Sequence, residues 1–355
     1  MSTPFTATHD LYIAGAGAGA VDRFEFDAAT GRFSDPGESY PAAKVRALAA
    51  TADGRLLYAG LTTDPPVAQA FTRGPDGALS PLATARLGDS TAYIALAADD
   101  SALFSASYHA SSVHLLEIDD DGVPVPPPVE APAVGEKAHS ALPSPDGRHV
   151  YAASLGSDAV VVYRRAARGL EEVQRVAAPA GSGPRHSRFD PAGRRLYVLH
   201  EMSGLVAVYD RDAESGELTE RQQISSIPDE LGLTPGFARE PGGPTPGPDA
   251  IWCADLHFGC AGRFLYTTER SSSTVTGFAV DLGSGELAYA GTWPTQQQPR
   301  GAAVVSAEDG DYLLVAGEAS ATLGAYRLEP STGAPAETDA TRTSEGPLWV
   351  TPVAR

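Results

Sequence analysis

Side chains that could bind an anion or move a proton recur in this sequence at regular intervals. His139 and Arg185 lie 46 residues apart, and Glu201 and Arg270 lie 69 apart. Arginine presents fork-shaped N–H donors to carboxylate or phosphate oxygens. Glutamate and histidine can transfer protons near neutral pH when their surroundings shift their pKa values. If repeated positions face one place in the fold, these residues would form a site for a small anionic ligand.

A short apolar pair, usually ending in an aromatic residue, sets the period of the repeat. From the second residue of one pair to that of the next, the steps are 46, 46, 47, 46, 69 and 48 residues. The long step equals one repeat of 46 plus 23 residues, which a Pro/Gly-rich insertion at about 224–250 absorbs. The pairs are Leu11-Tyr12, Leu57-Tyr58, Leu103-Phe104, Val150-Tyr151, Leu196-Tyr197, Leu265-Tyr266 and Leu313-Leu314.

Each repeat contains several short β-rich runs separated by glycine turns, and no helical periodicity is legible. Val160-Val161-Val162-Tyr163 is one such run, and Ser215-Gly216 is one such turn. This pattern is typical of all-β structure, and about 46 residues per unit is the size of a four-stranded propeller blade. Seven units predict a seven-bladed β-propeller formed by residues 1–355 as one domain.

The two ends of the chain indicate how this ring closes. The segment from Gly346 to Val350 resembles the first strand of a blade, whereas Leu11–Ala14 begins at a second strand. We therefore expect the C-terminal strand to pair with the N-terminal one, which leaves no open sheet edge.

Equivalent positions in the blades should point the same way, toward the axial channel. Twelve residues before the second residue of the pair lies a first-strand position, and four residues after it the second strand ends. The first set is Arg46, Ala92, His139, Arg185, Ala254, Arg300 (after a longer turn) and Leu348; the second is Ala16, Thr62, Tyr108, Leu155, Glu201, Arg270 and Glu318. These residues predict a polar, cationic mouth of the channel. The same residues would also be found if they only formed a solvated channel wall with no catalytic role.

The overall charge limits the partners. Against 26 Lys+Arg the chain has 45 Asp+Glu, a formal net charge of −19, which argues against nucleic acid and anionic membranes. Two cysteines are too few for a disulfide framework or a thiolate metal site. No apolar run approaches a membrane helix, and no signal peptide is legible. We expect a soluble, cytoplasmic protein, a monomer or weak homo-oligomer, whose anion site is cationic against the overall field.

Several motifs at these positions resemble those of the propeller-type lactonases, whose bacterial members are 6-phosphogluconolactonases. The resemblance extends blade by blade over essentially the whole chain. It differs at Glu269 and His200, where relatives tend to have Asn, and in the Pro/Gly-rich insertion. The matching stretches are residues 139–146 (HSALPSPD), 183–186 (GPRH), 200–203 (HEMS), 251–257 (IWCADLH), 298–301 (QPRG) and 346–350 (GPLWV).

This resemblance implies one of two chemistries. One branch opens 6-phosphogluconolactone in carbohydrate metabolism, within the pentose phosphate pathway; the other resembles fungal carboxymuconate cyclases, which close a lactone without a cofactor. The cyclase branch has a proposed site of one His, two Arg and one Glu. By motif these fall on His139, Arg185, Glu201 and Arg270, the same four residues that the repeat places together.

Lactone hydrolysis without metal or cofactor is the leading hypothesis. Glu201 or His139 would be the general base, while Arg185 and Arg270 would stabilise the oxyanion. The alternatives are a muconate-type cycloisomerase and a non-catalytic binding propeller. The substrate, a small anionic lactone, is expected to contact Arg46, Tyr108, His186, His257 and Arg300.

Overall fold

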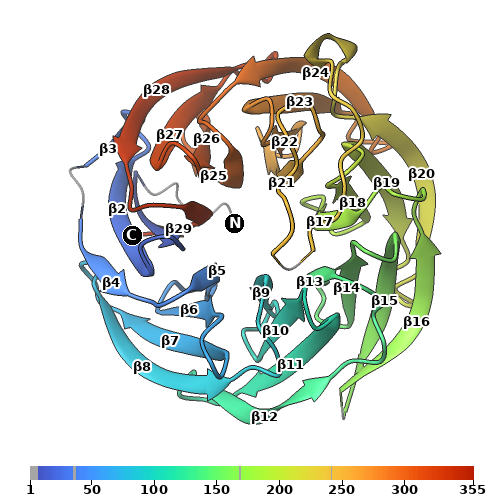
Figure 1. The fold of residues 1–355 in the computed structure, drawn as a ribbon. Coiled ribbons are helices and arrows are strands. Elements are labelled where there is room, and N and C mark those ends of the chain that lie inside the picture. Colours follow the sequence, from blue (N-terminus) through green and yellow to red (C-terminus); the bar gives the residue numbers. More distant parts are fainter. Residues whose placement is uncertain (1–6, 35–36, 168, 241) are drawn as a thin grey trace.

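The computed structural model describes residues 7–34, 37–167, 169–240 and 242–355, and these form seven antiparallel sheets around a central axis (Figure 1). This arrangement confirms the predicted seven-bladed, four-stranded propeller. In sequence order, the strands of the first four blades are β1 (Thr8–Gly15), β2 (Ala20–Asp27), β3 (Arg32–Phe33) and β4 (Ser39–Pro41); β5 (Val45–Ala50), β6 (Leu56–Leu61), β7 (Val67–Arg73) and β8 (Leu79–Arg86); β9 (Tyr93–Leu96), β10 (Ala102–Ser107), β11 (Ser112–Ile118) and β12 (Pro124–Glu130); β13 (Ala138–Pro143), β14 (His149–Ser154), β15 (Ala159–Ala166) and β16 (Gly169–Ala177).

The remaining three blades continue the pattern, and the last strand of the chain completes the first blade. These strands are β17 (Pro184–Phe189), β18 (Arg195–His200), β19 (Leu205–Arg211) and β20 (Leu218–Ser225); β21 (Cys253–Gly259), β22 (Phe264–Glu269), β23 (Thr274–Val280) and β24 (Leu287–Pro294); β25 (Pro299–Ala307), β26 (Gly310–Gly317), β27 (Thr322–Leu328) and β28 (Pro335–Arg342); and β29 (Pro347–Ala354). One 3-10 helix, η1 (Asp229–Leu231), lies in the insertion between β20 and β21.

The repeated aromatic residue explains how neighbouring blades are joined. In five blades it is a buried tyrosine on the second strand, whose hydroxyl donates to a glycine carbonyl in the β-turn before the outer strand of the next blade. Each of these glycines has a positive φ, which a turn residue with a side chain adopts only with strain. The pairs are Tyr12 to Gly77, Tyr58 to Gly122, Tyr151 to Gly216, Tyr197 to Gly285 and Tyr266 to Gly333, at 2.6–2.8 Å.

The ring closes as the sequence predicts. β29 pairs antiparallel with β1, with Val350 opposite Ile13, so the C-terminal segment is the innermost strand of the first blade. An ion cluster reinforces this closure: Asp10 is fully buried and accepts hydrogen bonds from Arg23, Arg73 and Arg355. The cluster thus joins the first blade, its neighbour and the end of the chain.

The innermost strands carry a feature that positions the site. Five of them have a register shift, or β-bulge, at the first-strand position counted from the repeat: the unpaired residues are Arg46, His139, Arg185, Arg300 and Leu348. The residue two places earlier has a positive φ in each case: Lys44, Lys137, Gly183, Gln298 and Gly346. A bulge redirects a side chain that regular pairing would hold against the next strand. In these five blades the repeat therefore turns one residue toward the axis; a sixth innermost strand, β21, has a longer shift between Cys253 and Leu256, and its counted residue, Ala254, does not line the cavity.

The insertion does not extend the propeller sideways. It leaves β20, returns at β21, and reaches inward toward the centre of the ring (Figure 1). Gly236 N–H donates to Met202 O, and Thr234 and Ala250 form an isolated bridge. The bridge closes the insertion on itself, while Met202 of the fifth blade and Ser271 of the sixth, whose hydroxyl donates to Ala250 O at 2.6 Å, hold it against the ring.

Candidate functional site

A cavity of about 450 Å³ lies at the centre of the propeller, between the innermost strands and the insertion. Ten of the positions counted from the repeat line it: Arg46, Thr62, Ala92, Tyr108, His139, Arg185, Glu201, Arg270, Arg300 and Leu348. Ala16, Leu155, Ala254 and Glu318 do not line it. The period of the sequence is therefore a good guide to which side chains share the cavity.

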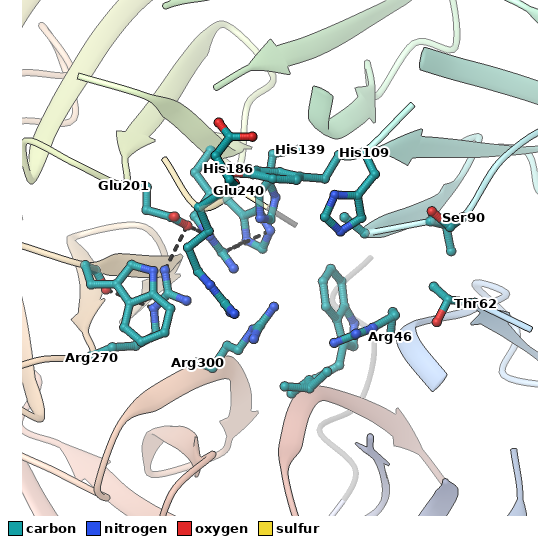
Figure 2. A pocket seen from close by; sticks show the side chains of 18 of the residues that line it. Arg46, Thr62, Ser90, His109, His139, His186, Glu201, Glu240, Arg270 and Arg300 are labelled. Carbon is teal, nitrogen blue, oxygen red and sulfur yellow. Dashed lines mark hydrogen bonds and ion pairs between the residues drawn. The ribbon is translucent and has the colours of Figure 1, made fainter. Parts of the chain in front are cut away.

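Glu201 is the centre of a buried ion cluster on one side of this cavity (Figure 2). Its Oε2 accepts from Arg185 Nε at 2.6 Å and from Arg270 Nη2 at 2.8 Å. All three residues are at most 5% exposed. Both arginines bind the same oxygen, and Oε1 has no hydrogen-bond partner among the residues that the structure describes. One carboxylate oxygen is thus left available to a ligand.

The charges of this cluster keep Glu201 ionised. Burial alone would raise its pKa, but the guanidinium groups of Arg270 and Arg185 outweigh burial and hold the pKa of Glu201 below its ordinary value. Burial lowers the pKa of both arginines, and Glu201 opposes that effect. Because an arginine starts so far above neutrality, both remain cations.

The two arginines are also fixed by main-chain acceptors on β21 and on the segment before it. Arg270 Nε donates to Trp252 O at 2.9 Å, and its Nη2 to Cys253 O at 2.9 Å. Arg185 Nη1 donates to Ala254 O. The Arg270 guanidinium also lies 3.8 Å from the centre of the Trp252 ring, a cation–π contact. Their donors are therefore preorganised before any ligand binds.

His139 lines the same cavity, and the ring nitrogen that it can offer to a ligand is Nε2, which has no hydrogen-bond partner among the described residues, whereas Nδ1 is shielded from water. It is 6% exposed, and its Nδ1 has no hydrogen-bond partner in the described part of the chain. Its ring lies 5.1 Å from that of His186 and 5.9 Å from that of Tyr108. Burial, and after it the charge of Arg185, lowers the pKa of His139 well below its ordinary value. This imidazole is therefore neutral at pH 7.

His186 lines the cavity and is oriented by a buried carboxylate. Its Nδ1 lies 3.0 Å from Asp255 Oδ1, and the other Asp255 oxygen lies 3.1 Å from His257 Nε2. Burial and the charge of Arg185 lower the pKa of His186 to about 3, against the effect of Asp255. Asp255 is thus a positioning residue behind the cavity wall.

His257 is not where we expected a substrate contact. It lies behind Asp255, between that carboxylate and Arg188, and is not among the residues lining the cavity. The register shift on β21 spans Cys253 to Leu256, and directly after it the His257 side chain lies against Arg188 of the fifth blade instead of the cavity.

Arg46, Arg300 and Tyr108 line the cavity at a distance from the buried cluster. Arg300 pairs with Glu318 at 3.1 Å, and Arg46 has no ion pair or hydrogen bond with the described residues. In Figure 2 both arginines extend toward the middle of the cavity. Tyr108 donates its hydroxyl to Arg239 O at 2.9 Å, and burial raises its pKa.

Sequence reasoning missed several lining residues. Trp252 and Trp349 flank inner positions, so counting one or two places from the repeat position would have found them. Ser90, Thr91 and His109 lie equally near such positions. Arg239 and Glu240 belong to the insertion, which shares no register with the blades. Glu269, where relatives tend to have Asn, lies outside the cavity and accepts from Trp252 N at 2.7 Å, so it positions that ring.

The described part of the lining is cationic although the chain is strongly acidic. It contains five arginines against two glutamates, Glu201 and Glu240. No group of three His, Cys, Asp or Glu side chains within the described ranges is arranged to hold a metal ion. The site thus offers guanidinium donors, one open carboxylate oxygen and one free imidazole nitrogen to an anionic ligand.

A model of the lactonase family with a seven-bladed β-propeller matches residues 7–352 of the chain. The chain belongs to this family. It is 32% identical over 303 residues to a 6-phosphogluconolactonase of Pectobacterium carotovorum, covering 84% of this chain and 85% of that one. A 6-phosphogluconolactonase of an Enterobacter species is 30% identical over 310 residues, covering 86% and 88%. The predicted lactonase activity is confirmed at this level.

Solved structures agree with the fold of this lactonase. The periplasmic gluconolactonase of Pseudomonas aeruginosa superposes with a TM-score of 0.83 at 26% identity, covering 98% of this chain and 99% of that one. A structure from Bacteroides fragilis reaches 0.84 at 21% identity, covering 99% and 100%, which supports the fold alone. Among the described residues, no helix is long and apolar enough to cross a membrane.

Proposed function

We propose that this lactonase hydrolyses a small anionic sugar lactone, 6-phosphogluconolactone, to 6-phosphogluconate. The observation that carries the proposal is Glu201, whose Oε2 is held by two buried arginines while Oε1 is left without a partner. The names of the sequence relatives support the phosphorylated substrate. The cationic lining supports an anionic one. A cytoplasmic location and a monomeric or weakly associated state remain predictions.

In this mechanism Glu201 Oε1 accepts a proton from a water molecule while the oxygen of that water attacks the lactone carbonyl carbon. The carbonyl π electrons move to oxygen, and Arg185 and Arg270 stabilise the resulting oxyanion. Collapse of the tetrahedral intermediate re-forms the carbonyl and breaks its bond to the ring oxygen. That oxygen takes the proton from Glu201 and becomes the hydroxyl group, so Glu201 is again a carboxylate; the new carboxylic acid then releases its own proton to water. Every step uses side chains of the chain itself, without a metal.

The two candidate bases differ in what they offer. Glu201 is anionic at neutral pH because the arginines keep its pKa low, and its open oxygen can orient a water molecule from the moment of binding. His139 is neutral, and its Nε2 is the ring nitrogen that faces a ligand without a hydrogen-bond partner among the described residues. We therefore assign Glu201 as the base and His139 to a hydrogen bond with the leaving ring oxygen. Both groups are weak bases because their pKa values are lowered. A weak base is sufficient here, since the ring makes the lactone more reactive than an open-chain ester.

The test follows the opening of freshly prepared 6-phosphogluconolactone to 6-phosphogluconate. We expect wild-type protein to accelerate it over the spontaneous rate, and Arg185→Ala and Glu201→Gln to remove the acceleration. His139→Asn should retain part of it, because Glu201 is intact. No acceleration by folded wild-type protein overturns the assigned substrate. Unphosphorylated gluconolactone and a muconate-type dicarboxylate then distinguish another lactonase from a cycloisomerase.

A further inference from the structure

The insertion places a charged residue over the cavity, on backbone that is fixed from both sides. Before that residue, Gly236 N–H donates to Met202 O at 2.8 Å. At it, Arg239 O accepts from Tyr108 Oη at 2.9 Å. Directly after it, Glu240 Oε1 pairs with Lys137 Nζ at 2.8 Å. The fourth, fifth and third blades all supply partners, so this part of the insertion is positioned by the ring.

The side chain so positioned, Arg239, lines the cavity without a partner of its own. Its Nε is shielded from water and makes no hydrogen bond within the described residues. A guanidinium nitrogen withdrawn from water without an acceptor costs free energy. Fixed backbone and an unsatisfied donor are together what a preorganised ligand-binding residue shows before its ligand arrives.

Two further cations lie near Arg239. Withdrawal from water, and then the like charge of Arg300, lowers the pKa of Arg46, and Arg239 adds to this repulsion. Arg300 is partly balanced by Glu318, whereas Arg46 and Arg239 have no anion paired with them among the described residues. An anionic ligand group would relieve this repulsion, since it supplies the missing negative charge.

We infer that Arg239, with Arg46 and Arg300, forms a subsite for a second anionic group of the substrate, separate from the Glu201–Arg185–Arg270 cluster. This rests on the proposed function and deepens it, because the lactone carbonyl is assigned to the Glu201 side. The insertion then sets specificity: it makes the enzyme select lactones with a terminal phosphate over uncharged ones. Arg239 is a specificity-determining residue that binds substrate and takes no part in the proton transfers.

Binding of the two stable products measures this inference without catalysis. Calorimetric titration of the whole protein with 6-phosphogluconate and with gluconate gives the preference for the phosphate. We expect wild type to bind 6-phosphogluconate more tightly, and Arg239→Ala to lose about tenfold or more of that affinity with gluconate binding unchanged. Arg239→Lys should recover part of it. Arg86→Ala removes an exposed arginine outside the cavity, and this matched control should behave as wild type.

Kinetics on the two lactones separates this inference from the proposed function. Arg239→Ala should raise KM for 6-phosphogluconolactone and leave kcat/KM for gluconolactone unchanged. Equal loss on both lactones, or no preference for 6-phosphogluconate in wild type, overturns the subsite even if hydrolysis occurs. A protein that opens neither lactone but binds 6-phosphogluconate through Arg239 overturns the proposed function and supports the subsite. Glu240→Gln, which removes the ion pair between the insertion and Lys137, should also weaken binding of 6-phosphogluconate, but less than Arg239→Ala does.

Discussion

Two buried carboxylates in this molecule are held by arginines, and they are used differently. Asp10, at the closure of the ring, accepts from Arg23 and Arg355 on Oδ1 and from Arg73 on Oδ2. Glu201, in the cavity, accepts from Arg185 and Arg270 on Oε2 alone. Both clusters are a buried carboxylate held by arginines, three at Asp10 and two at Glu201, but only Asp10 has both oxygens occupied.

The number of carboxylate oxygens that accept hydrogen bonds distinguishes the Asp10 cluster, which is structural, from the Glu201 cluster, for which we propose a catalytic role. With both oxygens bound, Asp10 has no capacity left for a ligand, and its arginines tie together β1, β2, β7 and the end of the chain. Glu201 keeps one open oxygen at the cavity wall, so a ligand can complete its coordination. Buried ion pairs add little net stability unless all their groups are satisfied. The unsaturated cluster therefore fits the catalytic role that we propose for Glu201.

The largest effect is expected from Glu201→Gln. It should lower kcat/KM for lactone opening by about 10²–10⁴-fold, because the general base is removed while shape is retained. The amide oxygen still accepts from one arginine, so we expect a smaller loss of stability than at Asp10. Activity is followed by product formation and stability by urea unfolding. If the variant loses activity only in proportion to its unfolded fraction, Glu201 is a structural residue like Asp10.

Asp10→Asn should lower stability strongly and activity little, the reverse of Glu201→Gln. It leaves three arginines facing a neutral amide, and loss of one partner from a buried ion cluster costs about 3 kcal/mol. Urea unfolding measures this loss, while kcat/KM per folded molecule should stay close to wild type. The comparison between the clusters fails if activity falls well beyond the loss of folded protein.

The pH dependence of the two clusters should differ as well. Burial would raise the pKa of Asp10, but hydrogen bonds from Arg355, Arg73 and Arg23 outweigh it and lower the pKa. A lowered native pKa means stability that is present above the unfolded value and is lost as the pH falls through the folded one. The stability gap between wild type and Asp10→Asn should thus be constant at neutral pH and shrink below about pH 4.

The plot of kcat/KM against pH should show no rise or fall over the range in which histidine usually titrates. The pKa values of Glu201 and His139 are both lowered, so kcat/KM should be flat from about pH 8 to pH 5. Gluconolactone is the substrate for this measurement, because a phosphate titrates near pH 6. After subtraction of the spontaneous rate, a midpoint near 6.5 would assign the base to an ordinary histidine and remove Glu201 from that role.

The fold and most of the cavity could be predicted because a propeller converts sequence period into spatial symmetry. His139, Arg185 and Arg300 occupy equivalent bulges. Counting from the apolar pair gives the first two, whereas Arg300 had to be recognised from its Pro-Arg-Gly context, because the turn in that blade is two residues longer. His257 lies outside the cavity because it follows a register shift on β21 that the repeat does not show, and such a shift changes the face to which later side chains point. Arg239 had no signal at all, since the insertion is outside the repeat. Nor does the sequence show that Glu201 keeps a free oxygen, which depends on side-chain geometry.

The smallest effect is expected from a variant close to Glu201 that weakens the packing between blades. It tests whether activity depends on that packing. Tyr197 lies on β18, the strand that ends just before Glu201, and its hydroxyl donates to Gly285 O at 2.7 Å. Tyr197→Phe removes this interblade hydrogen bond and should cost about 1 kcal/mol of unfolding free energy. The third and seventh blades have Phe104 and Leu314 at the equivalent position, so the ring already tolerates the absence of this bond in two blades. Unchanged kcat/KM would show that Glu201 is positioned without help from this hydroxyl; a tenfold fall would mean that blade packing and the site are coupled.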